Sequence, residues 1–301
     1  MLYYRYHYLW SEFFNILGHE TVVSPVSNRE ILEKGQAYSM DESCLPSKLF
    51  MGHVHALNGL CDMVLMPRVV SLSKNEKICV KFSALYDSVR TVFKDVRLLD
   101  YSVDIEKNQS EKAAFLAIGK ALGHNKTKSA RAYAAASAYC ARMLDAEDAA
   151  EKKKFLLSSL KILLVGHTYN LHDAMIGVPV AALLKRLGAA VIYSDKLKAL
   201  DVCAKNTYNY WTFNKELLAA AEYYKSKADG IIFLTAFPCG PDSLVHELAL
   251  RNFKNMPVCH LVIDELKSES GIETRLECFM DIVKAKASLN AGNDCLNGLV
   301  I

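Results

Sequence analysis

Three cysteines stand at points where the chain leaves an apolar run and enters a helical pattern. They are Cys44, Cys79 and Cys239, in the contexts DESCLPSKLF, EKICVKFSAL and LTAFPCGPDS. Because they are far apart in sequence, they can converge only at one edge of a folded sheet. Three convergent thiolates without a fourth suggest an iron–sulfur cluster in which one iron keeps an open position. An iron with an open coordination position can bind and activate a substrate, so these three cysteines are the first candidates for a functional site.

The loop around Cys239 is suited to holding a thiolate. The glycine after it allows a tight turn, Pro241 suits the first turn of a helix, and the helix dipole stabilises anionic sulfur. Cys44 also precedes a proline-started helix. Arg68 and several lysines near Cys79 are expected to lower thiol pKa values. The alternative is a free cysteine at a helix start, which the CGP sequence alone does not exclude.

The other cysteines predict no second metal site. The chain has 9 cysteines without disulfide-like spacing, so a reducing compartment with free or metal-bound thiols is favoured. Structural zinc sites commonly pair cysteines at CxxC spacing, which this sequence lacks. Four cysteines within or beside predicted elements are expected to fill the core: Cys61, Cys140, Cys259 and Cys278. No place is predicted for Cys203 and Cys295.

A second polar cluster follows the strand predicted at residues 161–166. The loop GHTYNLHD contains two imidazoles, a phenol, an amide and a carboxylate, from His167, Tyr169, Asn170, His172 and Asp173. Such a density of donors and acids favours general acid–base chemistry, with His167 and His172 as candidate catalytic residues. If so, the loop should face the same cavity as Cys239, because both loops leave one edge of a parallel sheet. The alternative is a polar connector with an Asx turn.

The second half of the sequence alternates short apolar runs with longer amphipathic ones. Strands are predicted at residues 161–166, 189–194, 230–237 and 257–264, and helices at 178–188, 213–227, 242–253 and 273–287. Gly188 is expected to end the first of these helices. The alternation favours a parallel, doubly wound sheet covered on both faces, with an α+β sandwich as the alternative.

The first half follows the same plan less regularly. Strands are predicted at residues 20–25, 62–67 and 95–102, and helices at 27–35, 46–60 and 83–93. An Ala-, Lys- and Glu-rich segment then predicts one or two long helices. We therefore expect an α/β fold with two Rossmann-like parallel-sheet lobes, at residues 1–107 and 159–288, a helical spacer at 108–158 and an irregular tail at 289–301.

Composition excludes several classes of function. Apolar residues make up 51% of the chain and charged residues 23%, and the net charge of +3 is too small to indicate nucleic-acid or membrane binding. The sequence has no apolar run of transmembrane length and no signal-peptide core, so a cytoplasmic protein is expected. Neither GxGxxG nor a P-loop motif is present, and any ATP-driven step would need another protein.

Several motifs together resemble the acyl-CoA dehydratase activase-related family. This family is kin to the iron–sulfur subunits of 2-hydroxyacyl-CoA dehydratases and to the double-cubane-cluster reductases. The motifs are VVSPVSNREILEKGQAYSMDESCLPSKLFMGHVHAL, MPRVVSLSKNEKICVKF, ILLVGHTYNLHD, YWTF, TAFPCGPDS and IDELKSESGIETRLECF, which span about residues 3–285. Their most specific part is the ordered set of three cysteine contexts.

The resemblance implies a 4Fe-4S cluster that Cys44, Cys79 and Cys239 hold between the two lobes. It also implies a separate ATP-hydrolysing activase that supplies low-potential electrons. By analogy with relatives, Glu265 would point into the cleft as a proton donor or as an extra iron ligand.

The residues around Glu265 also allow a structural role. An ion pair between Arg275 and one of the two acids that end the strand, Asp264 or Glu265, would pin the last helix to the sheet edge. The chain also departs from its relatives, which often read CPKF where this chain has CVKF and carry a histidine in place of Leu266. The second change removes an imidazole next to the acidic pair.

These features predict an iron–sulfur protein that accepts single electrons from the activase. Its open iron would bind a substrate oxygen as a Lewis acid, or pass an electron into a thioester to form a ketyl radical. An acyl-CoA or another small molecule is the expected ligand, and a homo- or heterodimer is compatible with this role. Two other classes stay open: a non-catalytic module that docks on an activase, and a cluster-free α/β ligand-binding protein.

Overall fold

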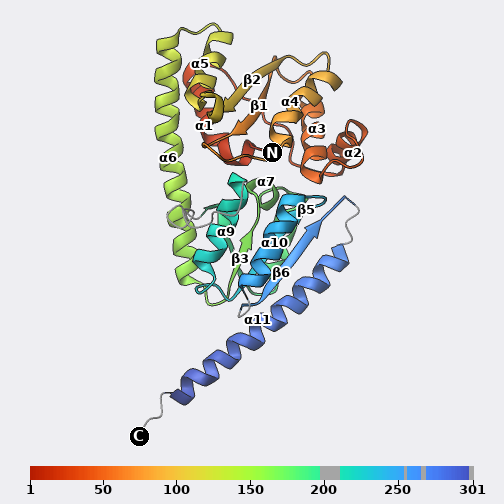
Figure 1. The fold of residues 1–301 in the computed structure, drawn as a ribbon, viewed down its shortest axis with the longest axis vertical. Coiled ribbons are helices and arrows are strands. Elements are labelled where there is room, and N and C mark those ends of the chain that lie inside the picture. The colour runs from red at the N-terminus through yellow and green to blue at the C-terminus, as the bar shows by residue number, and fades with distance from the viewer. Residues whose placement is uncertain (197–210, 254–255, 266–268, 298–301) are drawn as a thin grey trace.

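The structure, a computed structural model, describes residues 1–196, 211–253, 256–265 and 269–297. The described chain forms two lobes, each built around a parallel sheet (Figure 1). This confirms the predicted α/β fold. Within the described ranges, no helix combines the length and apolar character that a membrane crossing requires.

The second lobe contains four parallel strands in the order β4-β3-β5-β6. Their bounds confirm the four predicted strands: β3 (Lys161–Val165), β4 (Ala190–Tyr193), β5 (Gly230–Ala236) and β6 (Val258–Ile263). The central strand β5 is buried along its whole length, as its continuous apolar sequence requires. The order reverses direction between β3 and β5, which makes their carboxyl ends a topological switch point.

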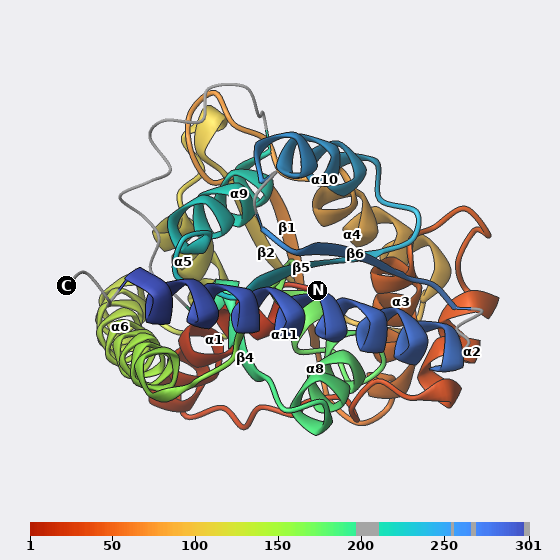
Figure 2. The same ribbon diagram turned by 90° about the horizontal axis from the view of Figure 1, so that it is seen from below.

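Helices cover both faces of this sheet, as a doubly wound fold requires (Figure 2). One face packs against α8 (Gly177–Arg186) and α11 (Glu269–Asn297), and the other against α9 (Thr212–Tyr224) and α10 (Gly240–Asn252). Gly188 follows α8 with φ 92°, a left-handed conformation that favours glycine, so the predicted helix end is confirmed.

The first lobe has a smaller sheet, in which β1 (Val64–Ser71) pairs in parallel with β2 (Leu98–Asp104). Its helices are α1 (Tyr3–Leu17), α2 (Arg29–Ala37), α3 (Leu45–Leu57), α4 (Lys81–Val92) and α5 (Glu111–Ala121). Helix α1 was not predicted, although its buried Leu9, Phe13 and Leu17 recur every four residues.

The strand predicted at residues 20–25 is wrong, because this segment has no regular secondary structure. The sheet of the first lobe consists of β1 and β2 among the described residues, and no backbone hydrogen bond joins this segment to either strand. Val22 and Val23 are 44% and 52% exposed. The β-branched residues give this segment a high local strand propensity, but propensity alone does not form a strand without pairing to a neighbour.

The predicted helical spacer consists of α5 and the 32-residue helix α6 (Lys126–Leu157). Phe115 of α5 lies in the core of the first lobe, and so do Ala132 and Ala136 of α6. At its other end, Glu151 of α6 accepts a 2.7 Å hydrogen bond from the backbone N–H of Tyr193 in β4. Helix α6 therefore runs along both lobes and joins them (Figure 1).

The irregular tail predicted from residue 289 is wrong as far as Asn297, because α11 stays helical to that point. Its first half is anchored by Leu276, Phe279 and Val283 in the core of the second lobe. Because this half already provides the nucleus, the helix continues without a new nucleation step through a segment that contains weak helix formers such as Asn290 and Gly292, and no proline interrupts it. Residues 298–301 lie outside the described ranges.

Helices α2 and α3 pack closely through two glycines. A Cβ atom added at Gly52 would overlap the carbonyl oxygen of Ile31, and one at Gly35 would overlap that of Lys48. Since α3 follows directly after Cys44, this helix contact positions one of the candidate site residues.

Gly52→Ala is therefore expected to lower the free energy of unfolding by about 1–3 kcal/mol through overpacking. At an ordinary helix position the same change would raise it by about 0.5–1 kcal/mol. Lys34→Ala, on the exposed side of α2, is the control and should change stability by less than about 0.5 kcal/mol. Urea unfolding measures both, and a stabilised Gly52→Ala variant would contradict the close packing.

Candidate functional site

Cys44, Cys79 and Cys239 line one cavity of about 140 Å³ between the two lobes. The cavity lies beyond the carboxyl ends of β3 and β5, where a doubly wound sheet binds its ligands. It is much larger than the roughly 10–15 Å³ that one water molecule needs. The structure therefore brings together three cysteines that the sequence holds far apart.

Backbone contacts fix the loops that carry these cysteines. Cys44 and Cys239 each directly precede a helix, α3 and α10, with a proline in its first turn. The N–H of Leu45 donates a 3.1 Å hydrogen bond to the carbonyl of Phe237, which joins the two loops across the lobes. Cys79 lies two residues before α4, and the carbonyl of Lys77 accepts a 2.9 Å hydrogen bond from the N–H of Thr212.

The thiol pKa values were expected to be low, and that expectation is wrong for two of the three cysteines. Burial raises the pKa of Cys239, and the carboxylate of Asp242 raises it further. Burial also raises the pKa of Cys79. Arg68 cannot offset this, because it pairs with Asp87 at 2.6 Å on the exposed side of α4. Desolvation therefore affects the pKa of these two thiols more than the neighbouring helix start does.

A single metal ion and an iron–sulfur cluster make different demands on the side chains that bind them. Within the described residues, no group of three or more His, Cys, Asp or Glu side chains is close enough to hold a single ion. A cluster makes a different demand, because each thiolate binds a different iron and the sulfurs stand a cluster's width apart. Three partly buried thiols around one cavity fit a cluster with three protein ligands.

His167 lines the same cavity and is held by a buried carboxylate. Its Nε2 lies 2.8 Å from Oδ1 of Asp242, which also accepts a 2.9 Å hydrogen bond from Asn214. Thr235 donates to the other carboxylate oxygen at 3.1 Å. Burial alone would raise the pKa of Asp242, but His167 and the hydrogen bond from Asn214 hold it below its usual range. The imidazole is thereby fixed at the cavity wall.

The rest of the predicted loop divides between different environments. Tyr169 lines the cavity, whereas Asn170, His172 and Asp173 do not, so the expectation that all five side chains face it is wrong. His172 Nε2 lies 2.8 Å from a carboxylate oxygen of Asp195, and Asp173 accepts a hydrogen bond from Ser27 of the first lobe. The loop forms the short helix α7 (Thr168–Leu171), which turns its successive side chains in different directions.

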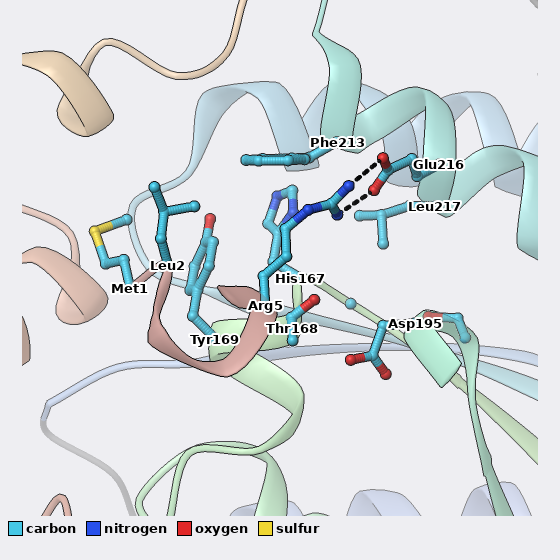
Figure 3. Close-up of a pocket in the computed structure, with 12 residues that line it drawn as sticks. Met1, Leu2, Arg5, His167, Thr168, Tyr169, Asp195, Phe213, Glu216 and Leu217 are labelled. Atoms are coloured by element: carbon cyan, nitrogen blue, oxygen red, sulfur yellow. Dashed lines mark hydrogen bonds and ion pairs between the residues drawn. The ribbon is translucent and has the colours of Figure 1, made fainter. Parts of the chain in front are cut away.

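Figure 3 shows a second, smaller cavity of about 40 Å³. His167 and Tyr169 line this cavity as well as the first. Arg5 of α1 forms two hydrogen bonds there, of 2.7 and 2.8 Å, with the carboxylate of Glu216 in α9. The guanidinium also lies 4.9 Å from the ring centre of Phe213. This pair is another connection between the lobes beside the site.

Glu265 does not line the cavity of the cysteines, so the expectation that it points into this cleft is wrong. Its carboxylate accepts hydrogen bonds of 2.7 and 2.9 Å from Lys48, whose side chain is only 5% exposed. Lys48 lies one helical turn after Cys44. Glu265 therefore forms a structural ion pair, and its carboxylate connects the end of β6 to α3 rather than to α11.

The remaining cysteines lie mostly beside apolar cores. Cys61, Cys140 and Cys259 are partly buried and pack against three different core clusters. The prediction is wrong for Cys278, which is exposed, because α11 turns Leu276 and Phe279 towards the sheet instead. Cys203 and Leu266 lie outside the described residues.

Sequence reasoning did not select Glu42, Lys48 and Asp242 as site residues. Glu42 lines the cavity, and Asp242 holds His167. The position of Asp242 in the first turn of a helix after a central strand was a usable signal. The pairing of Lys48 with Glu265 joins residues 217 positions apart, so no local pattern could reveal it.

Comparison with known proteins gives one family match. A family model described as the CoA enzyme activase uncharacterised domain (DUF2229) matches residues 1–197 of the 301. The matched part includes Cys44, Cys79 and the loop of His167, and it ends before Cys239. No curated protein matches the chain.

The pair of Lys48 and Glu265 can be tested by a double-mutant cycle. Lys48→Met and Glu265→Gln should each lower the free energy of unfolding by about 2–4 kcal/mol, because each leaves a largely buried charge without its partner. The double variant should lose less than the sum, with a coupling of about 1–3 kcal/mol.

The exposed pair of Arg29 and Glu33 is the matched control for this cycle. Its side chains are 87% and 61% exposed, and its coupling should not exceed about 0.5 kcal/mol. Strictly additive effects of the Lys48 and Glu265 substitutions would show that this pair does not join the lobes.

Proposed function

The chain belongs to the CoA enzyme activase uncharacterised-domain family, and from this premise we propose that it is an iron–sulfur protein of the 2-hydroxyacyl-CoA dehydratase and reductase superfamily. In this role it binds a 4Fe-4S cluster through Cys44, Cys79 and Cys239. It accepts low-potential electrons from an ATP-hydrolysing activase. The family match confirms the resemblance that the cysteine contexts indicated.

The observation that carries the proposal is the shared cavity. Three cysteines from the loops that precede α3, α4 and α10 line one cavity at the switch point of the sheet. The three loops are tied to one another or to the opposite lobe by backbone hydrogen bonds. A ligand set of this kind leaves the fourth iron without a cysteine, since no other described cysteine lines the cavity.

The bound cluster would supply electron transfer and a Lewis-acidic iron for an acyl-CoA or a related small molecule. The residues around it have separate tasks. His167, fixed by Asp242, would hold a proton at the cavity wall. Phe82 and Phe213, both buried at the wall, keep bulk water away from the thiols.

One observation favours a second candidate function, a non-catalytic module that carries the cluster and docks on the activase. Glu265, the acid expected in the cleft, is engaged by Lys48 and does not line the cavity. An assay with the activase, ATP and an acyl-CoA separates the candidates, because only a catalytic protein consumes the thioester. His167→Gln should then abolish consumption while iron content is retained.

Iron analysis tests the proposed cluster. Anaerobically purified protein, reconstituted with iron and sulfide, should contain about four irons per chain. Cys44→Ser, Cys79→Ser and Cys239→Ser should each lose most of this iron, because each removes one of only three protein ligands. Cys278→Ser, at an exposed position on α11, is the control and should retain it.

A cluster-free ligand-binding protein would give the opposite result. Wild type and all four variants would then contain the same trace of iron. Such an outcome, in protein shown to be folded by circular dichroism, would refute the proposed cofactor.

A further inference from the structure

Tyr169 occupies a fixed place in the wall of the cysteine cavity. Its ring stacks on His167, with centroids 5.0 Å apart and an interplanar angle of 15°. Phe82 of the first lobe meets it edge-on at 5.8 Å. The ring is thus held by groups from both lobes, and aromatic contacts of this kind restrict its orientation.

The hydroxyl of Tyr169 is not used within the protein. None of the described residues forms a hydrogen bond with it, whereas the hydroxyls of Tyr101 and Tyr133 donate to Glu111. Figure 3 shows the hydroxyl directed away from α7, on the side of the ring opposite its backbone. A phenol that is well fixed at its ring and unpaired at its oxygen is available to a ligand of the cavity.

The electrostatic surroundings make this hydroxyl a donor. Burial raises the pKa of Tyr169 well above 10, and Asp242, Cys239, Cys44 and Cys79 each raise it further. All three candidate ligand thiols therefore act on the same phenol. Since burial is the largest of these influences and opposes ionisation of the phenol, the hydroxyl keeps its proton and can donate it in a hydrogen bond.

We propose that Tyr169 donates a hydrogen bond to the group that Cys44, Cys79 and Cys239 hold, and thereby sets its reduction potential. This inference rests on the proposed function, since it needs a cluster in the cavity. A donor to cluster or thiolate sulfur stabilises the reduced, more negatively charged state more than the oxidised one. Tyr169 is therefore a tuning residue that makes the cluster easier to reduce.

The experiment compares reduction potentials in anaerobically reconstituted protein. Potentiometric titration followed by electron paramagnetic resonance should show a more negative potential for Tyr169→Phe, which removes only the hydroxyl. Site-specific replacement of Tyr169 by 3-fluorotyrosine, a stronger donor of the same shape, should shift the potential to more positive values. Tyr193→Phe, in the same lobe but outside both cavities, should leave it unchanged.

The opposite signs distinguish tuning from a structural role, because loss of packing would not reverse with fluorination. Equal potentials in wild type, both Tyr169 variants and Tyr193→Phe would overturn the inference and leave the cluster intact. If Tyr169→Phe fails to retain iron, the 3-fluorotyrosine variant alone tests the inference: a more positive potential supports it, and an unchanged or more negative potential overturns it. If wild type itself takes up no cluster, the proposed function and this inference fall together.

Discussion

The site depends on the contacts that fasten α3 of the first lobe to the strand ends of the second. The N–H of Leu45 bonds to the carbonyl of Phe237, and one turn later Lys48 pairs with Glu265 just beyond β6. This connection places the loop of Cys44 against the loop of Cys239. Glu265 therefore helps to position the cavity wall through Lys48, although it does not line the cavity itself.

The surroundings of Cys79 and Cys239 do not favour reactive nucleophiles, because the pKa of each thiol is raised. A reactive cysteine usually has a lowered pKa, produced by a nearby cation or a helix start. Here burial and the carboxylate of Asp242 raise the pKa of Cys239, so its thiol stays protonated until a cation replaces the proton. Irons would supply that positive charge, and His167 remains beside them as a group tied to the same carboxylate.

The sequence predicted the second lobe well, because continuous apolar strands such as β5 and amphipathic helices are local patterns. It also predicted that the three cysteines converge, although not at one shared sheet edge: Cys239 follows β5, whereas Cys44 follows α2 and Cys79 lies beyond β1 of the other sheet. It failed at residues 20–25, where β-branched residues have no strand to pair with, and at Glu265, whose partner Lys48 is distant in sequence. The sequence also did not reveal which side chains around α7 face the cavity, because a short helix directs neighbouring side chains such as Tyr169 and His172 to different sides.

The central claim is that three cysteines hold a four-iron cluster with one distinct iron. Mössbauer spectroscopy of anaerobic protein reconstituted with ⁵⁷Fe tests it most directly, because it resolves iron sites by their ligands. The account predicts a 4Fe-4S spectrum in which one iron subsite differs from the other three. Four equivalent sites would indicate a fourth cysteine ligand, and a spectrum without cluster iron would contradict the account entirely.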